Sequence, residues 1–551
     1  MVTNSLPAAL GIDRAHRRVI FASSLGTVFE WYDFYLYGSL APIITKQFFS
    51  GVNETTGFIL ALLAFAAGFF VRPFGALVFG RLGDMAGRKY TFLITIVIMG
   101  SSTALVGALP NYATAGLLAP MALIALRLLQ GLALGGEYGG AATYVGEHAP
   151  PGNRGRYTSW IQTTATLGLF LSLVVIVLCR SWLGPEFETW GWRIPFLLSI
   201  VLLAVSVYIR LQLAESPVFL EMKAEGRQSR APLTESFARW DNGRLVLLAL
   251  FGATAGQAVV WYCGQFYALL FLTQTLKVEA QTANLLVAAA LLAATPFFVF
   301  FGSLSDRVGR KKIVLSGCLL AALTYVPIYK AITHYANPAI ESASLHSPVR
   351  VIADPGACSF QFDPVGKKRF TRSCDVAKAA LAKAGVPYAN VAASAGTVAA
   401  VQIGDAAPIP AVEGSMMSSA DFKVASDAFG KSVSVALTEA GYPAKADPAQ
   451  IDRFMVWLLL FLLVLYVTMV YGPIAAWLIE LFPARIRYTS MSLPYHIGNG
   501  WFGGFVPAIA FALVALKGDI YYGLRYPIIV ALMTLVIGVL FLPETKDRPL
   551  R

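Results

Sequence analysis

The chain has 551 residues, of which 57% are hydrophobic and 13% are charged, and its mean hydropathy is +0.63. A water-soluble protein carries roughly a quarter charged residues, so the composition excludes an ordinary soluble protein. The net charge of +12 does not indicate a nucleic-acid partner, because the basic residues fall in alternate loops between apolar runs, as they do in cytoplasmic loops of membrane proteins.

Apolar runs of about 20 residues recur along the chain, and each is long enough to cross a bilayer as a helix. The predicted spans are 18–45, 56–80, 90–110, 114–145, 157–181, 191–213, 245–275, 281–304, 313–334, 453–482, 488–516 and 521–543. We therefore predict an all-α membrane protein with twelve transmembrane helices. The basic loops place both termini in the cytoplasm, and a bacterial cytoplasmic (inner) membrane is the expected location.

Two loops between these spans have nearly the same sequence. GRLGDMAGRK at 80–89 and GSLSDRVGRK at 302–311 lie 222 positions apart, which indicates two six-helix repeats. Glu147 and Glu480 form a second pair at a spacing of 333. The difference of 111 residues is close to the length of a polar segment at 335–451, which we therefore interpret as an insertion.

The predicted organisation has five parts. They are a six-helix half at 1–215, a cytoplasmic linker at 216–244, helices 7–9 at 245–334, an extracytoplasmic insertion at 335–451 between helices 9 and 10, and helices 10–12 with the tail at 452–551. An amphipathic helix at 375–386 and a strand at 398–404 predict a small α/β domain for the insertion. Cys358 and Cys374 lie in it, and an oxidising exterior favours a disulfide between them over two free thiols.

The repeated loops resemble the signature loop of the major facilitator superfamily, which lies between spans 2–3 and 8–9. The second copy matches it fully, whereas the first has Met85 where that family usually has a basic residue. Aspartate and arginine in these loops could link neighbouring helix ends in one conformation and release them in another. The predicted latch residues are Asp84, Arg88, Asp306, Arg307, Arg310, Glu147 and Glu480.

Four further phrases resemble the metabolite:proton symporter family within that superfamily. They are FEWYDFYLYG at 29–38, RPFGALVFGRLGD at 72–84, RLLQGLALGGEYGGA at 127–141 and ELFPARIRYT at 480–489. The resemblance implies a carrier of organic acids, such as dicarboxylates and shikimate, or of zwitterions such as proline and betaine. It also links the RLLQG phrase, which begins at Arg127, to proton coupling.

Glu30 and Asp33 are acidic residues inside the first predicted span, on one face of the helix. Ionisable groups at that depth are costly unless they are paired or hydrated. Burial favours the protonated carboxyl and a nearby arginine favours the carboxylate, so a conformational change could switch between the two states. We predict Glu30, Asp33 and Arg127 as proton-coupling residues, with a permanent ion pair that only orients the helix as the alternative.

Polar and aromatic side chains in other spans are candidates for binding a solute. The predicted substrate-binding residues are Tyr37, Arg72, Glu137, Tyr138, Trp261, Tyr262, Gln265, Tyr471 and Asn499. Arg72 and Arg127 are the expected partners of the buried acids, and their positive charge favours a carboxylate as substrate.

The sequence thus predicts a secondary transporter that takes up a small organic acid with protons by alternating access. The alternatives are a proton-coupled carrier of a zwitterionic osmolyte, and a membrane solute sensor that uses the insertion. A membrane enzyme is least supported, because no catalytic or metal-binding cluster is evident. The lack of a GxxxxGK(S/T) loop argues against ATP-driven pumping. The expected partners are the organic anion, the proton as coupling ion and the lipid bilayer, with no other cofactor, no nucleic acid and a monomeric state.

Overall fold

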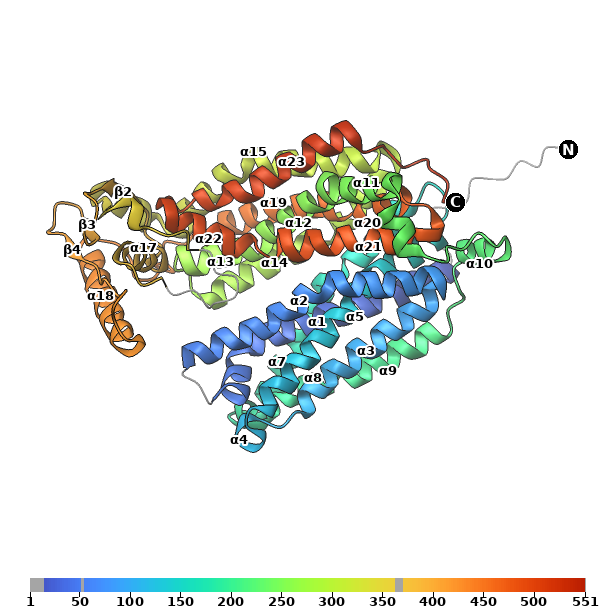
Figure 1. Ribbon diagram of the computed structural model, residues 1–551, viewed down its shortest axis with the longest axis horizontal. Helices are drawn as coiled ribbons and strands as arrows, with labels where there is room; N and C mark the ends of the chain where they lie inside the picture. The colour runs from blue at the N-terminus through green and yellow to red at the C-terminus, as the bar shows by residue number, and fades with distance from the viewer. Residues whose placement is uncertain (1–13, 51–53, 362–369, 551) are drawn as a thin grey trace.

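The computed structural model describes residues 14–50, 54–361 and 370–550. Two bundles of long helices lie side by side, and a smaller unit with strands lies at one end of the second bundle (Figure 1). We call this end the insertion end. The opposite end, which carries α10 (Pro217–Ala224), is called the α10 end.

The first bundle holds the N-terminal helices. They are α1 (Arg14–Phe48), α2 (Glu54–Met85), α3 (Arg88–Ala108), α4 (Tyr112–Ala115), α5 (Leu118–His148), α6 (Arg154–Gln162), α7 (Thr164–Leu183), α8 (Arg193–Leu197) and α9 (Ser199–Leu211). Helices α2 and α5 approach closely because glycines face the partner backbone. A Cβ atom on Gly131 would lie 2.1 Å from the Gly68 carbonyl oxygen, and one on Gly135 would lie 2.2 Å from the Arg72 carbonyl oxygen. This contact fixes Arg72 beside α5.

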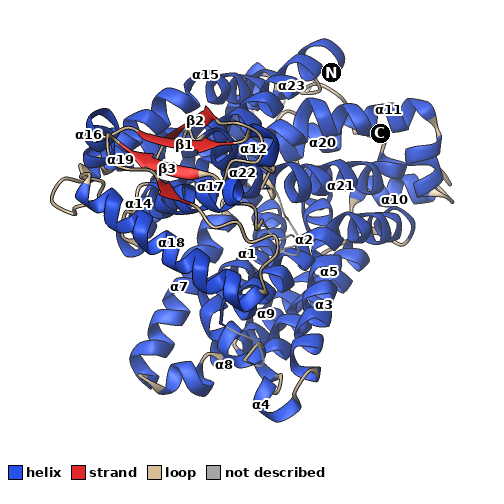
Figure 2. Ribbon diagram, turned by 60° about the vertical axis from the view of Figure 1, so that its left-hand side comes forward, coloured by secondary structure: helices blue, strands red, loops and turns tan. Residues whose placement is uncertain are grey.

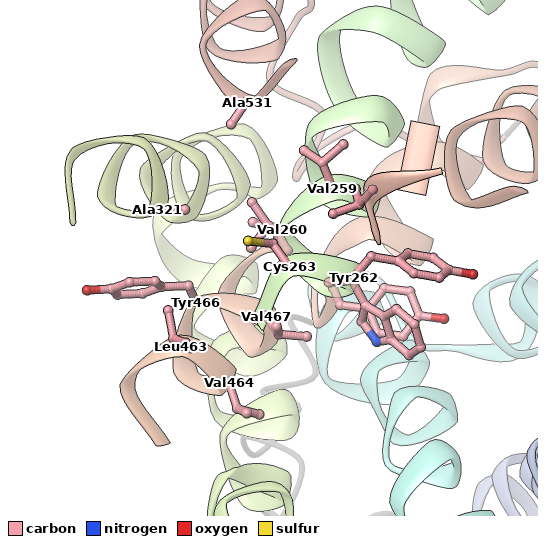
Figure 3. Packing of buried hydrophobic residues seen from close by; sticks show 14 of the residues in the cluster. Val259, Val260, Tyr262, Cys263, Ala321, Leu463, Val464, Tyr466, Val467 and Ala531 are labelled. Carbon is pink, nitrogen blue, oxygen red and sulfur yellow. The ribbon is translucent and has the colours of Figure 1, made fainter. Parts of the chain in front are cut away.

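The second bundle is interrupted by several π-helical turns. Its helices are α11 (Trp240–Ala249), α12 (Ala255–Tyr262), α13 (Ala268–Leu270), α14 (Ala280–Val308), α15 (Arg310–Ala336), α19 (Arg453–Tyr471), α20 (Ile474–Leu481), α21 (Arg487–Ile497), α22 (Val506–Lys517) and α23 (Arg525–Phe541). Their buried apolar side chains form one cluster. Figure 3 shows part of it around Cys263, with Ala321 of α15, Val467 of α19 and Ala531 of α23.

Ten helical segments within the described residues are long and apolar enough to cross a membrane. They coincide with the third to the twelfth predicted spans. Helices α1 and α2, of 35 and 32 residues, lie at the positions of the first two. The chain is therefore a helical, multi-pass membrane protein, while the count of twelve spans stays a prediction.

The polar segment between α15 and α19 forms a unit with its own apolar core. Its elements are α16 (Pro338–His346), β1 (Val349–Ala353), α17 (Ser373–Ala384), β2 (Tyr388–Ala392), β3 (Ala400–Ile403), β4 (Ile409–Pro410) and α18 (Ser419–Glu439). The four strands form one sheet in the order β2-β1-β3-β4 (Figure 2). Strand β1 pairs in parallel with β2 and antiparallel with β3. The helix and strand predicted in this segment are confirmed as α17 and β3, and Cys358 and Cys374 are joined by a disulfide.

Candidate substrate and proton-coupling site

A central cavity lies between the two bundles. It is lined by Thr27, Glu30, Trp31 and Phe34 of α1, Phe69 and Arg72 of α2, Tyr138 of α5, Trp261 and Tyr262 of α12, Tyr471 of α19, Tyr495 of α21, and Asn499 just beyond α21. Only about 30 Å³ of it is open to a water molecule, which is room for roughly two waters. The site is therefore contracted in this conformation.

Two ion pairs connect α1 to its neighbours, one at this cavity and one beside it within the first bundle. Asp33 accepts a hydrogen bond of 2.8 Å from Nη1 of Arg127 and one of 3.2 Å from Gln130. Glu30 lies 3.4 Å from Nη1 of Arg72. All four charged residues also line a small adjoining cavity. The acids are thus paired, and they border space that water can reach.

Several donors at the site have no partner among the described residues. They are Nε of Arg72, Nε and Nη2 of Arg127, and Nε1 of Trp261. Buried donors are normally satisfied, and leaving one unpaired costs about 1–3 kcal/mol. Arg72 and Trp261 both line the central cavity, so a ligand with acceptor oxygens would satisfy them there.

Aromatic side chains from the two bundles meet around the cavity. Tyr138 of α5 stacks on Tyr495 of α21, with ring centroids 3.6 Å apart. Trp31 of α1 lies 5.2 Å from Trp261 of α12, and the hydroxyls of Tyr471 and Tyr495 are 2.6 Å apart. The Tyr138–Tyr495 and Trp31–Trp261 contacts cross between the bundles, whereas the Tyr471–Tyr495 contact lies within the second bundle.

The structure brings most of the predicted binding residues together. Arg72, Tyr138, Trp261, Tyr262, Tyr471 and Asn499 line the central cavity. The ring of Tyr37 lies 3.7 Å below the guanidinium of Arg127, beside the adjoining cavity. Asn499 exchanges two amide hydrogen bonds, of 3.2 and 3.3 Å, with Gln257, a residue that the sequence did not suggest.

Glu137 and Gln265 line neither cavity. Glu137 accepts hydrogen bonds from Arg210 at 2.5 Å and from Thr95 at 2.8 Å. Arg210 of α9 therefore neutralises this carboxylate, and a role of Glu137 or Gln265 in binding the substrate stays a prediction. No sequence pattern indicated this pair, since the two residues are 73 positions apart.

At the α10 end, charged residues of the repeated loops link the two bundles. Arg88 lies 3.1 Å from Asp84 and 3.4 Å from Glu147, and Glu147 lies 2.7 Å from Arg487 in the second bundle. Asp84 also accepts hydrogen bonds from the backbone amides of Tyr488 and Thr489. The first copy of the loop therefore contacts the second bundle, even though it has Met85 in place of a basic residue.

The second copy makes the equivalent contacts with the bundles exchanged, so that its residues contact Arg154 of the first bundle. Arg310 lies 2.7 Å from Asp306 and 3.1 Å from Glu480, and Glu480 lies 3.4 Å from Arg154 of the first bundle. Arg307, a predicted latch residue, is exposed and forms no ion pair with any residue that the structure describes.

Sequence reasoning did not assign four residues of this network. Arg154 and Arg487 each pair with the glutamate of the opposite bundle, and their spacing of 333 equals that of Glu147 and Glu480. Glu215 and Glu544 accept hydrogen bonds from the backbone amides of Arg88 and Arg310. The repeat spacing was the available signal for all four.

Comparisons with known proteins agree with this architecture. The family model described as "Sugar (and other) transporter" matches residues 19–242 and 429–551, and that described as "MFS/sugar transport protein" matches residues 149–340. A shikimate transporter of Escherichia coli K12 is 35% identical over 330 residues, which cover 59% of this chain and 74% of the relative. An alpha-ketoglutarate permease of the same strain is 36% identical over 323 residues, covering 58% and 72%.

A proline/betaine transporter of Salmonella typhimurium LT2 is 35% identical over 321 residues, covering 57% of this chain and 64% of the relative. Among solved structures, the proton:xylose symporter XylE bound to 6-bromo-6-deoxy-D-glucose has the same fold, with a TM-score of 0.60, 16% identity and 97% of each chain covered. The chain therefore belongs to the sugar (and other) transporter family of the major facilitator superfamily, and it is a membrane transporter rather than an enzyme.

Proposed function

We propose that this chain carries a small organic acid into the cell together with protons, by alternating access around the central cavity. One observation supports the proposal above the others. Two buried acid–arginine pairs, Glu30–Arg72 and Asp33–Arg127, border a small cavity within the first bundle, and Glu30 and Arg72 also line the central cavity between the two bundles. Buried charges of this kind are expensive in a membrane unless a function requires them.

The chemistry of the Asp33–Arg127 pair supports coupling. When Asp33 binds a proton, Arg127 loses its counter-charge, and its unpartnered Nε and Nη2 donors become available to a substrate carboxylate. When the proton leaves, the carboxylate of Asp33 competes for the same guanidinium. Proton binding and anion binding therefore favour each other, as symport requires.

The contacts between the bundles support a gated cycle. The ion-pair network holds the α10 end closed, and the Trp31–Trp261 contact lies beside the cavity. Because the cavity holds roughly two waters, an organic acid requires the bundles to separate. We propose that the α10 end is cytoplasmic, that the insertion lies outside, and that two six-helix halves with twelve spans rock about the site in a bacterial inner membrane.

A zwitterionic osmolyte is the second candidate, and the aromatic lining favours it. Eight of the twelve lining residues are aromatic, and Glu30 lies among them. Aromatic faces beside a carboxylate attract a quaternary ammonium group, while Arg72 would hold the carboxylate of the same molecule. Two of the relatives named above carry acids by their names, and one carries proline or betaine.

Uptake into proteoliposomes under an imposed proton gradient tests the proposal. Radiolabelled shikimate, 2-oxoglutarate, proline and glycine betaine are supplied in turn to wild type, Asp33→Asn and Arg127→Gln. Asp241→Asn, which changes an exposed acid, is the matched control. We expect gradient-dependent accumulation of an acid in wild type and in the control only. Accumulation that persists in Asp33→Asn and Arg127→Gln would refute the coupling role.

A solute sensor is distinguished in the same vesicles. A sensor would bind one of the four solutes without accumulating it, in the presence or absence of a gradient. Rapid accumulation by wild type would exclude the sensor, and a preference for betaine over every acid would establish the osmolyte alternative.

A further inference from the structure

A groove in the inserted unit runs between α17 and α18, and one residue of the second bundle completes it. The groove has a volume of about 670 Å³, which is large enough for a small organic molecule. Apolar side chains, three lysines and one aspartate line it. Those used below are Lys277, Lys383, Asp427, Lys431, Phe422 and Leu437.

Lys277 joins the groove to the transport bundle. It follows the π-helical turn Phe271–Thr275, which ends the helical segment that contains Trp261, and it precedes α14. Its ammonium donates a hydrogen bond of 2.6 Å to the carbonyl oxygen of Lys383, at the end of α17. Its own carbonyl oxygen accepts one of 3.0 Å from the amide of Ala446.

The backbone of Lys277 is in an unfavourable conformation. Its φ angle is 57°, and it is the one non-glycine residue with positive φ among the residues that the structure describes. Such a conformation costs about 1–2 kcal/mol in an L-residue and is retained where the surroundings or a function require it. The side chain of this half-buried lysine lines the groove.

The lysines of the groove lack counter-charges. None of Lys277, Lys383 and Lys431 forms an ion pair within the described ranges, although Asp427 lines the same groove. Burial and the neighbouring charge of Lys383 both lower the pKa of Lys277. A carboxylate placed between the two ammonium groups would remove this repulsion.

We propose that the groove is a second binding site, separate from the central cavity, for a small organic anion. Its carboxylate would lie between Lys277 and Lys383, and its apolar body would lie against Phe422 and Leu437. Because Lys277 continues the segment that carries Trp261, an occupied groove would hold the inserted unit against that segment. This proposal rests on the groove alone and not on the proposed transport function.

Equilibrium binding of ¹⁴C-benzoate to the purified full-length protein in neutral-lipid nanodiscs tests it. To remove the central site from the measurement, the reference protein carries Arg72→Gln and Arg127→Gln. We expect this protein to bind benzoate and to ignore the uncharged analogue benzamide. Adding Lys277→Gln and Lys383→Gln should weaken binding about tenfold or more, because charge-assisted hydrogen bonds are lost.

Lys423→Gln with Lys445→Gln is the matched control, since both lysines are exposed in the same unit and do not line the groove. Retention of the disulfide and of the thermal unfolding transition shows that each variant folds. Equal binding by the groove variant and the control would overturn the proposal. It would also be overturned if the reference protein, with Arg72→Gln and Arg127→Gln, did not bind benzoate. Displacement of benzoate by nanodiscs that contain phosphatidylglycerol, with no effect of free acids, would assign the lysines to a lipid headgroup and also overturn it. Uptake assays decide the transport function separately.

Discussion

Asp84 and Asp306 occupy equivalent positions 222 residues apart, and each binds the first turn of a helix in the opposite bundle. Asp84 accepts hydrogen bonds of 3.2 and 2.9 Å from the amides of Tyr488 and Thr489, at the start of α21. Asp306 accepts two of 2.8 Å from the amides of Gly155 and Arg156, at the start of α6. Helix N-termini attract carboxylates, so the repeat builds one clamp twice, in opposite directions.

Replacing Asp84 or Asp306 by alanine should open the α10 end. Each substitution removes two charge-assisted hydrogen bonds between the bundles, each worth about 1.5–3 kcal/mol. We expect the equilibrium to shift at least roughly tenfold toward the open state. Spin labels at the exposed residues Arg81 and Lys312, measured by double electron–electron resonance, should show a longer distance.

Asp547→Ala provides the control for this measurement, because the side chain of Asp547, in the tail that follows α23, is 86% exposed. Its label distances should match those of wild type. Unchanged distances in both clamp variants would mean that the closed state does not depend on these carboxylates.

The acids of α1 should differ from surface acids in their effect on transport. Asp33→Asn mimics the protonated side chain, so gradient-driven accumulation should fall to passive equilibration while exchange of labelled for unlabelled solute persists. Glu188→Gln is the control, because Glu188 pairs with Lys46 at 3.3 Å on the surface, where an ion pair contributes little. Loss of exchange together with accumulation would instead indicate a structural ion pair.

The repeats in the sequence predicted the residues of the clamp, whereas the residues of the cavity had to be predicted from their polarity within the spans. Loop residues at constant spacing identify equivalent positions, and the structure places Asp84 and Asp306 at equivalent contacts. The pairing of Arg210 with Glu137 has no such signal, because helix periodicity gives the face of a residue and not its partner on another helix.

Hydropathy located the long helices of both bundles, including α1 and α2. Glu30, Asp33 and Arg72 lie within the apolar runs of these two helices, and the same charges carry the candidate site. The size of the cavity could not be predicted, because it depends on how far the bundles are separated. The groove of the inserted unit was not predictable for a similar reason, because Lys277 lies outside the segment 335–451 and no pattern in the sequence relates it to Lys383.

Removing an aromatic wall of the cavity should weaken substrate binding without affecting folding. Trp261→Leu deletes a ring that packs on Trp31, and aromatic contacts of this kind contribute about 0.5–1.5 kcal/mol. We expect KM to rise about two- to tenfold, and more for a quaternary ammonium substrate than for an organic acid. The control is Trp182→Leu, since Trp182 is 79% exposed. Equal KM values in both variants would remove Trp261 from the site.

Loss of the Cys358–Cys374 disulfide should destabilise the inserted unit and leave the bundles intact. The bond closes a loop with a sequence separation of 16, for which the chain-entropy model gives roughly 3 kcal/mol. Cys358→Ser with Cys374→Ser should therefore speed tryptic cleavage between α16 and α18, as located by mass spectrometry, and reductant should do the same to wild type. Cleavage within α1–α9 should not change, because the bond does not touch that bundle. Labelling of both cysteines by a thiol reagent in the native, unreduced protein would show instead that the bond is absent.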